Sequence, residues 1–105
     1  DAMLNLGQIY KNMGRFVNAE DLYTRAFKSN PMCTACLFKL GSLYHEMEKY
    51  VKAIKHFEKT IEHDPEHIAA RKNLALSRRM FLLEFSTIRK QVGKPIISSV
   101  RKDFG

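Results

Sequence analysis

The chain has little of several residues that mark particular classes of protein. Tryptophan is absent, and the 105 residues include only two cysteines, three prolines and five glycines. Two cysteines are too few for the disulfide framework of a small secreted domain, which favours a reducing compartment. The modest proline and glycine content, together with 45% hydrophobic residues, indicates an ordered, helix-rich chain rather than a disordered one. No apolar run reaches membrane-spanning length, and no signal peptide is visible.

Sequence motifs of catalysis are missing as well. The chain has no glycine-rich phosphate loop, no H-E-x-x-H motif and no nucleophile elbow, and its carboxylates are scattered. We therefore expect a protein that is not an enzyme and that holds no cofactor or metal.

Positive charge is concentrated near the C-terminus. Residues 1–65 carry nine Lys and Arg against eight Asp and Glu, whereas residues 66–105 carry nine against three. Nearly all of the net charge of +7 therefore lies in the last forty residues. The chain also begins inside a pattern at Asp1, without an initiator methionine, so we interpret it as a fragment of a longer protein.

An internal repeat with a period of 34 residues organises the first two thirds of the chain. Three motifs return at this spacing: Leu6-Gly7-x-x-Tyr10 as Leu40-Gly41-x-x-Tyr44, Ala19-x-x-x-Tyr23 as Ala53-x-x-x-Phe57, and Asn30-Pro31 as Asp64-Pro65. The pattern resembles the tetratricopeptide repeat, with Met3 and Leu37 where that family often has tryptophan. The resemblance implies an all-α solenoid of antiparallel helix pairs that acts as a protein-protein interaction scaffold, with repeats over residues 1–33 and 34–67.

The helix boundaries follow from this register. We predict helices near residues 2–13, 16–29, 35–47 and 50–63. Gly7 and Gly41 each cost about 1 kcal/mol inside a helix, so we expect them to permit close contact between helices. Ala19 and Ala53 would serve the same purpose from the partner helices.

Cys33 and Cys36 form a C-x-x-C motif. Such a motif can belong to a metal site or to a redox pair, or it can have no chemical role. A structural zinc ion would need two more ligands, and the only histidine pair available, His63 and His67, straddles Pro65. In the repeat register, Cys36 falls on a small, half-buried position and Cys33 falls in the turn between repeats. We therefore interpret them as packing and turn residues.

A partner-binding groove is implied by the resemblance, because the first helix of each pair lines the concave side of such solenoids. The groove positions transferred residue by residue are Leu4, Asn5, Gln8, Lys11, Asn12, Phe38, Lys39, Ser42, His45, Glu46, Lys72, Asn73 and Arg79. Phe38 and Lys39 would bind one apolar and one acidic group of a peptide, unless Phe38 is covered by its neighbours. Asn5 and Lys39 also match part of the carboxylate clamp of chaperone-binding members. Ala35 stands at a basic position of that clamp, which leaves it incomplete.

The repeat pattern ends after Pro65. We predict one basic amphipathic capping helix over residues 66–92, ended by Gly93 and Pro95, and a flexible tail over residues 93–105. The helix has apolar residues on two faces, which require either a folded-back tail or a second protein to cover them. The hydrophobic interface predicted there consists of Met80, Phe81, Leu83, Phe85 and Ile88.

These features define the expected partners. The groove is predicted to bind a protein or peptide, with an acidic partner favoured by the charge. In isolation we expect the chain to self-associate through residues 76–92, or to bind a partner helix there. The alternative is a basic helix module that binds an acidic protein, a calmodulin-like partner or an anionic membrane, with the repeats as support. Nucleic acid is disfavoured, because aromatic residues do not alternate with the basic ones on one face.

Overall fold

Five α-helices make up the chain in the computed structural model, which describes the backbone of residues 2–104 and the side chains of residues 2–86. They are α1 (Ala2–Asn12), α2 (Phe16–Ser29), α3 (Thr34–Glu46), α4 (Tyr50–His63) and α5 (Ile68–Phe104), and the described backbone contains no strand. The first four lie within one residue of the predicted boundaries, so the all-α architecture is confirmed.

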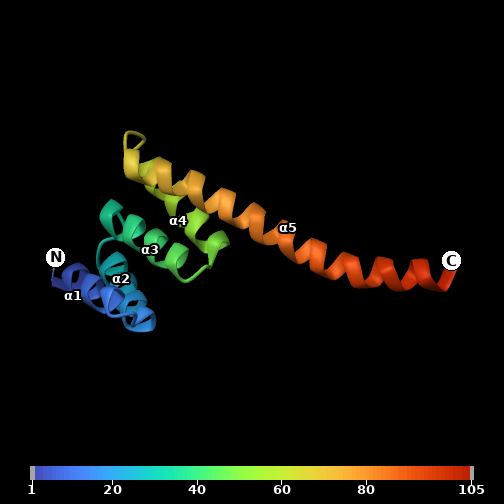
Figure 1. Ribbon diagram of the computed structural model, residues 1–105. Coiled ribbons are helices and arrows are strands. Elements are labelled where there is room, and N and C mark those ends of the chain that lie inside the picture. The colour runs from blue at the N-terminus through green and yellow to red at the C-terminus, as the bar shows by residue number, and fades with distance from the viewer. Residues whose placement is uncertain (1, 105) are drawn as a thin grey trace.

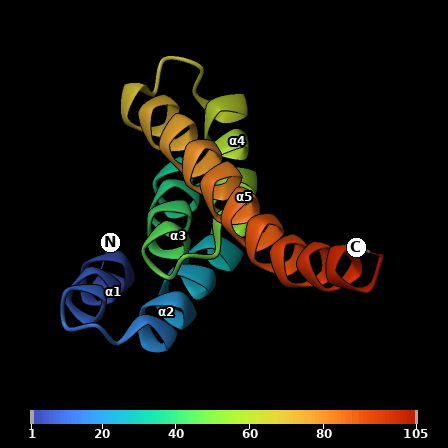
Figure 2. The same ribbon diagram turned by 45° about the vertical axis from the view of Figure 1, so that its right-hand side comes forward.

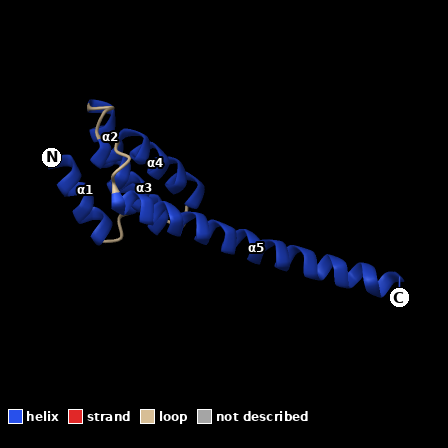
Figure 3. Ribbon diagram, turned by 90° about the horizontal axis from the view of Figure 1, so that it is seen from above, coloured by secondary structure: helices blue, strands red, loops and turns tan. Residues whose placement is uncertain are grey.

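The helices pack as two antiparallel pairs followed by a single long helix. α1 packs on α2 and α3 packs on α4, while α2 joins the first pair to α3 (Figure 1). The first part of α5 lies along α4, and its C-terminal part runs away from the other four helices (Figures 2 and 3). The molecule is therefore elongated, with extents of 64 × 30 × 20 Å.

The two helix glycines sit where the helices of each pair come closest. A Cβ placed on Gly7 would lie 2.5 Å from the Cε1 atom of Tyr23, and one placed on Gly41 would lie 2.7 Å from the Cε1 atom of Phe57. Real Cβ atoms do not approach a ring this closely. Because both rings are fully buried, any side chain at these positions would push the pair apart. The predicted role of the glycines is confirmed.

The second helix pair packs against the first through the contact between α2 and α3. Leu40 and Leu43 of α3 are 3% and 0% exposed. The Tyr44 hydroxyl donates a hydrogen bond to Oε2 of Glu20 on α2, over 2.5 Å. Burial, followed by this bond to the Glu20 carboxylate, raises the pKa of Tyr44 well above its ordinary value.

The first helix of each pair ends in the same tight turn. The amide of Arg15 donates to the carbonyl of Tyr10, and that of Lys49 donates to the carbonyl of Tyr44, each over 2.8 Å. Such a helix end requires one residue in the left-handed region. Gly14 fills that position in the first repeat with φ 78°, and Glu48 fills it in the second with φ 62°.

The turns between repeats are also equivalent at a spacing of 34 residues. Oδ1 of Asn30 accepts from the amide of Met32, and Oδ1 of Asp64 accepts from the amide of Glu66, each over 3.2 Å. A side chain then caps the next helix: His67 Nδ1 accepts from the Ala70 amide at 3.0 Å. This capping role gives His67 a local structural function at the start of α5.

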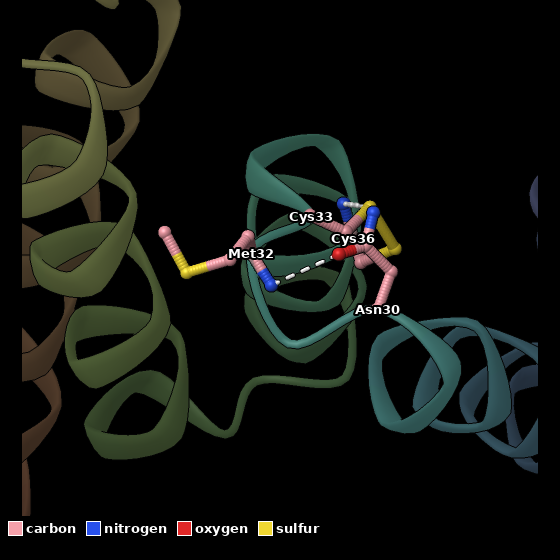
Figure 4. Close-up of a disulfide and its surroundings, with 4 residues drawn as sticks. All are labelled: Asn30, Met32, Cys33 and Cys36. Carbon is pink, nitrogen blue, oxygen red and sulfur yellow. Dashed lines mark hydrogen bonds between the residues drawn. A yellow bond between two sulfur atoms is a disulfide. The ribbon is translucent and has the colours of Figure 1, made fainter.

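The cysteines correct one prediction. Cys33 and Cys36 form a disulfide at the start of α3, with their Cα atoms 5.3 Å apart (Figure 4). Cys33 also caps the helix, because its Sγ accepts from the Cys36 amide over 3.0 Å. Cys33 lies at the end of the turn between repeats, as expected. Cys36 is fully buried rather than half-buried, and the two cysteines are covalently paired rather than separate packing residues. A spacing of three residues at a helix start brings the two sulfurs to the same side of the chain.

The structure of the last helix corrects two further predictions, the end of that helix and the tail after it. α5 begins at Ile68 and continues through Gly93 and Pro95 to Phe104, so the predicted end at Val92 and the flexible tail over residues 93–105 are wrong for the described backbone. The tail does not fold back onto the helix, because it is part of the helix (Figure 1). Proline removes one backbone donor and displaces one carbonyl. These are local losses, and the described backbone is helical on both sides of Pro95.

Candidate functional site

A pocket of about 280 Å³ opens between the first helices of successive units. It is lined by residues of α1, α3 and α5 and by one residue of α4: Lys11, Ser42, His45, Glu46, Phe57, Asn73 and Leu76. Five of these were predicted as groove positions, namely Lys11, Ser42, His45, Glu46 and Asn73. The pocket thus brings predicted residues from three successive units to one place.

Hydrogen bonds and an ion pair connect the two repeats beside this pocket. The Lys11 ammonium lies 3.4 Å from a carboxylate oxygen of Glu46. Lys39 Nζ donates to Oε1 of Gln8 over 3.2 Å, and Gln8 Nε2 donates to Asn12 over 3.0 Å. These contacts fix the relative positions of polar groups on α1 and α3, so a ligand would meet a largely preformed polar surface.

His45 connects the second repeat to α5. Its Nδ1 lies 2.9 Å from the hydroxyl oxygen of Ser77, which is fully buried. The ring also meets the Tyr50 ring edge-on, with centroids 5.3 Å apart. The side chain therefore holds α3, α4 and α5 together at one wall of the pocket.

Phe38 faces inward more than the sequence suggests. Its ring packs 5.9 Å from Phe57 and 4.7 Å from the His67 ring, measured between centroids, and it is only partly exposed. Phe38 does not line the pocket. Its contacts within the chain agree with the alternative in which neighbouring residues cover it.

Other predicted groove residues lie outside the pocket. The prediction for Leu4 is wrong, because this side chain is buried in the hydrophobic core. Asn5, Lys72 and Arg79 are exposed, and none of them lines the pocket. Leu76 does line it, but the sequence had not suggested it as a groove residue. The repeat register contained the signal, because Leu76 stands 34 residues after Ser42 and 68 after Gln8.

The predicted hydrophobic interface on α5 is exposed as far as the structure describes it. Met80 and Phe81 are 38% and 37% exposed, and Leu83 and Phe85 are 54% and 55% exposed. The rings of Phe81 and Phe85 stack with their centroids 6.4 Å apart. Ile88 lies beyond the side chains that are described.

A second pocket, of about 460 Å³, lies on the outer face of the first repeat. It is lined by residues of α1 and α2: Leu6, Tyr10, Val17, Asn18, Asp21, Leu22 and Arg25. Leu6 and Tyr10 are equivalent to Leu40 and Tyr44, which α2 covers in the second repeat. The face that α2 covers in the second repeat is thus open in the first, where Leu6 is 42% exposed.

The described part of the chain has neither a membrane-spanning helix nor a cluster of metal ligands. It contains no helix with enough length and hydropathy to span a bilayer. No three side chains among the described His, Cys, Asp and Glu residues gather in a way that could hold a metal ion.

Comparison with known proteins relates these features to a family. Two family models, both described as tetratricopeptide repeat, match residues 1–32 and 35–67, which together make up more than half of the chain. Neutrophil cytosol factor 2 from Bos taurus is 33% identical over 57 residues, covering 54% of this chain and 11% of that protein. A solved structure, the crystal structure of MamA protein, superposes with a TM-score of 0.74 at 28% identity and covers 84% of this chain and 48% of the other. This chain thus spans a small part of the first relative and about half of the second.

Proposed function

Because this chain belongs to the tetratricopeptide repeat family, whose fold is a non-catalytic scaffold for protein interactions, we propose that it binds a segment of a partner protein along α1, α3 and α5. The observation that carries this proposal is the pocket in which Lys11, His45 and Asn73 come together from these three helices. A site built from successive units suits a ligand that extends along them.

The charge on this face favours an acidic segment. The predicted groove residues include one acidic side chain, Glu46, and four cationic ones, namely Lys11, Lys39, Lys72 and Arg79. Lys11 is paired with Glu46 and Lys39 is bonded to Gln8. The cations at α5 therefore supply the attraction for carboxylates, while Ser42 and Asn73 offer hydrogen bonds to the ligand backbone.

A displayed library of random peptides tests the proposal. Peptides selected on the wild-type chain should lose at least about tenfold in affinity for Ser42→Trp, since the indole would fill the pocket. Ser29→Trp, at an exposed position at the end of α2, is the matched control and should bind like wild type. Peptides that bind both variants equally well would place the binding site elsewhere.

Two sequence-based predictions remain as proposals beside this one. Lys39→Glu should weaken binding, although Phe38→Ala is a poor probe because the ring packs against Phe57 and His67. Self-association through the exposed apolar residues of α5 also remains a prediction, and sedimentation at low and high salt tests it. Salt should strengthen that association by screening like charges on the basic helix.

A further inference from the structure

An exposed stripe on α5 alternates basic residues with leucines. Lys72, Leu76, Arg79 and Leu83 follow one another at intervals of four, three and four residues, which places them along one side of a helix. All four are exposed, with Leu76 at 50% and Leu83 at 54%. We call these four residues the α5 stripe.

The stripe lies away from the face by which α5 holds the rest of the molecule. Ala70, Leu74 and Ser77 form the buried face of the helix, with exposures of 0%, 9% and 0%. The leucines of the stripe add little to that contact. Leu76 and Leu83 are seven residues apart, the spacing at which a helix presents apolar side chains to a second helix lying along it.

The positive charge of the stripe is available to a partner, unlike that of the neighbouring arginines. Arg78 lies 3.1 Å from a carboxylate oxygen of Glu58, and Nε of Arg71 donates to the Pro65 carbonyl over 2.6 Å. Lys72 and Arg79 have no ion pair among the side chains described. Two uncompensated cations therefore flank the two exposed leucines.

We propose that the α5 stripe docks an acidic amphipathic helix of a partner protein. Aliphatic side chains of that helix would pack against Leu76 and Leu83, and its carboxylates would pair with Lys72 and Arg79. A second copy of this chain fits less well, because pairing two such stripes brings like charges together. The site goes beyond the proposed pocket: the two share Leu76, but Arg79 and Leu83 lie outside the pocket.

A designed peptide serves as the probe. It is about three heptads long, with leucine at positions a and d and glutamate at e and g, and a counterpart carries lysine in place of every glutamate. Fluorescence anisotropy with the whole chain should show binding of the acidic peptide, weakened by added salt. The basic counterpart should bind at least about tenfold more weakly.

Matched variants locate the site. Arg79→Glu and Leu83→Ser should each lower affinity for the acidic peptide about tenfold or more. Lys59→Glu on α4 and Leu82→Ser on α5, where the leucine is 63% exposed, should stay within about twofold of wild type. Circular dichroism checks that each variant is folded. If Leu83→Ser does not fold, Arg79→Glu and its control still decide the outcome.

Three results of the binding experiments would overturn the proposal, and a fourth would come from the oligomeric state. These are equal binding of the acidic and basic peptides, an equal loss in Leu82→Ser, and binding only to phosphatidylglycerol vesicles. A dimer of the free chain that Leu83→Ser disrupts would assign the stripe to a second copy instead. Ser42→Trp should weaken this binding far less than Arg79→Glu does, because Arg79 and Leu83 lie outside the pocket, so failure of the pocket and failure of the stripe are distinguishable.

Discussion

Equivalent residues of the two repeats differ widely in burial. Leu6 is 42% exposed and Leu40 is 3% exposed, while Ile9 is 54% exposed and Leu43 is 0% exposed. The sequences of the repeats are similar, but α2 covers one side of the second repeat and α5 covers the other. The energetic role of a repeat position is thus decided by the units stacked on it, in keeping with nearest-neighbour stability in solenoids.

The largest expected effect comes from filling the glycine contacts. Gly41→Leu should lower the free energy of unfolding by about 3 kcal/mol or more, because the new side chain would displace the buried Phe57 ring. Gly7→Leu should cost less, since the first repeat has an open outer face into which α1 can move. Urea denaturation of both variants measures the difference. A Gly41→Leu variant with wild-type stability would contradict the repeat register.

The next effect sharpens the burial difference directly. Leu40→Ala should cost about 2–5 kcal/mol, because it leaves a cavity between α2 and α3. Leu6→Ala should cost under about 1 kcal/mol, because Leu6 is already substantially hydrated. Thermal melts of the two variants at equal concentration test this. Equal losses would mean that another surface covers Leu6 in solution.

Exchanging the buried rings should give effects of opposite sign. The Tyr23 hydroxyl is buried and has no hydrogen-bond partner among the described residues, and burial is the main cause of its raised pKa. Tyr23→Phe should therefore raise the free energy of unfolding by about 1 kcal/mol. Phe57→Tyr should lower it by about 1–3 kcal/mol, since it introduces the same unsatisfied group. A loss of stability in Tyr23→Phe would indicate that the hydroxyl is bonded.

The smallest effect concerns the helix ends. Glu48 adopts φ 62° where the first repeat has glycine, and this conformation costs a side chain about 1–2 kcal/mol. Glu48→Gly should gain up to about 1 kcal/mol, since the greater freedom of glycine in the unfolded chain offsets part of the relief. Gly14→Ala should lose about 1 kcal/mol. Denaturant midpoints of both variants test the pair, and a destabilised Glu48→Gly would refute the argument.

The parts of the fold that could be predicted from sequence are those fixed by the repeat. Gly41 and Phe57 recur in register with Gly7 and Tyr23, so their contact follows from one periodicity. The end of α5 has no counterpart in the 34-residue repeat. The expectation that Gly93 and Pro95 end the helix was therefore the only guide, and it was wrong. The disulfide was also missed, because a C-x-x-C spacing fits several chemistries and only the helix start brings the sulfurs together.

The candidate site was predictable in part for the same reason. Lys11, His45 and Asn73 were found because they occupy groove positions of the register. The burial of Phe38 could not be predicted in this way, because its ring contacts His67, which belongs to the following turn. Contacts between units depend on the stacking of helices and cannot be obtained from one repeat alone.

The disulfide between Cys33 and Cys36 allows the redox state of the protein's compartment to be measured on the protein itself. Both cysteines are consumed by that bond, and the described chain has no free thiol. An alkylating reagent should therefore leave the mass of the protein unchanged until a reductant is added, after which two labels attach. The number of labels on protein taken directly from its natural setting would then record whether that compartment is oxidising or reducing.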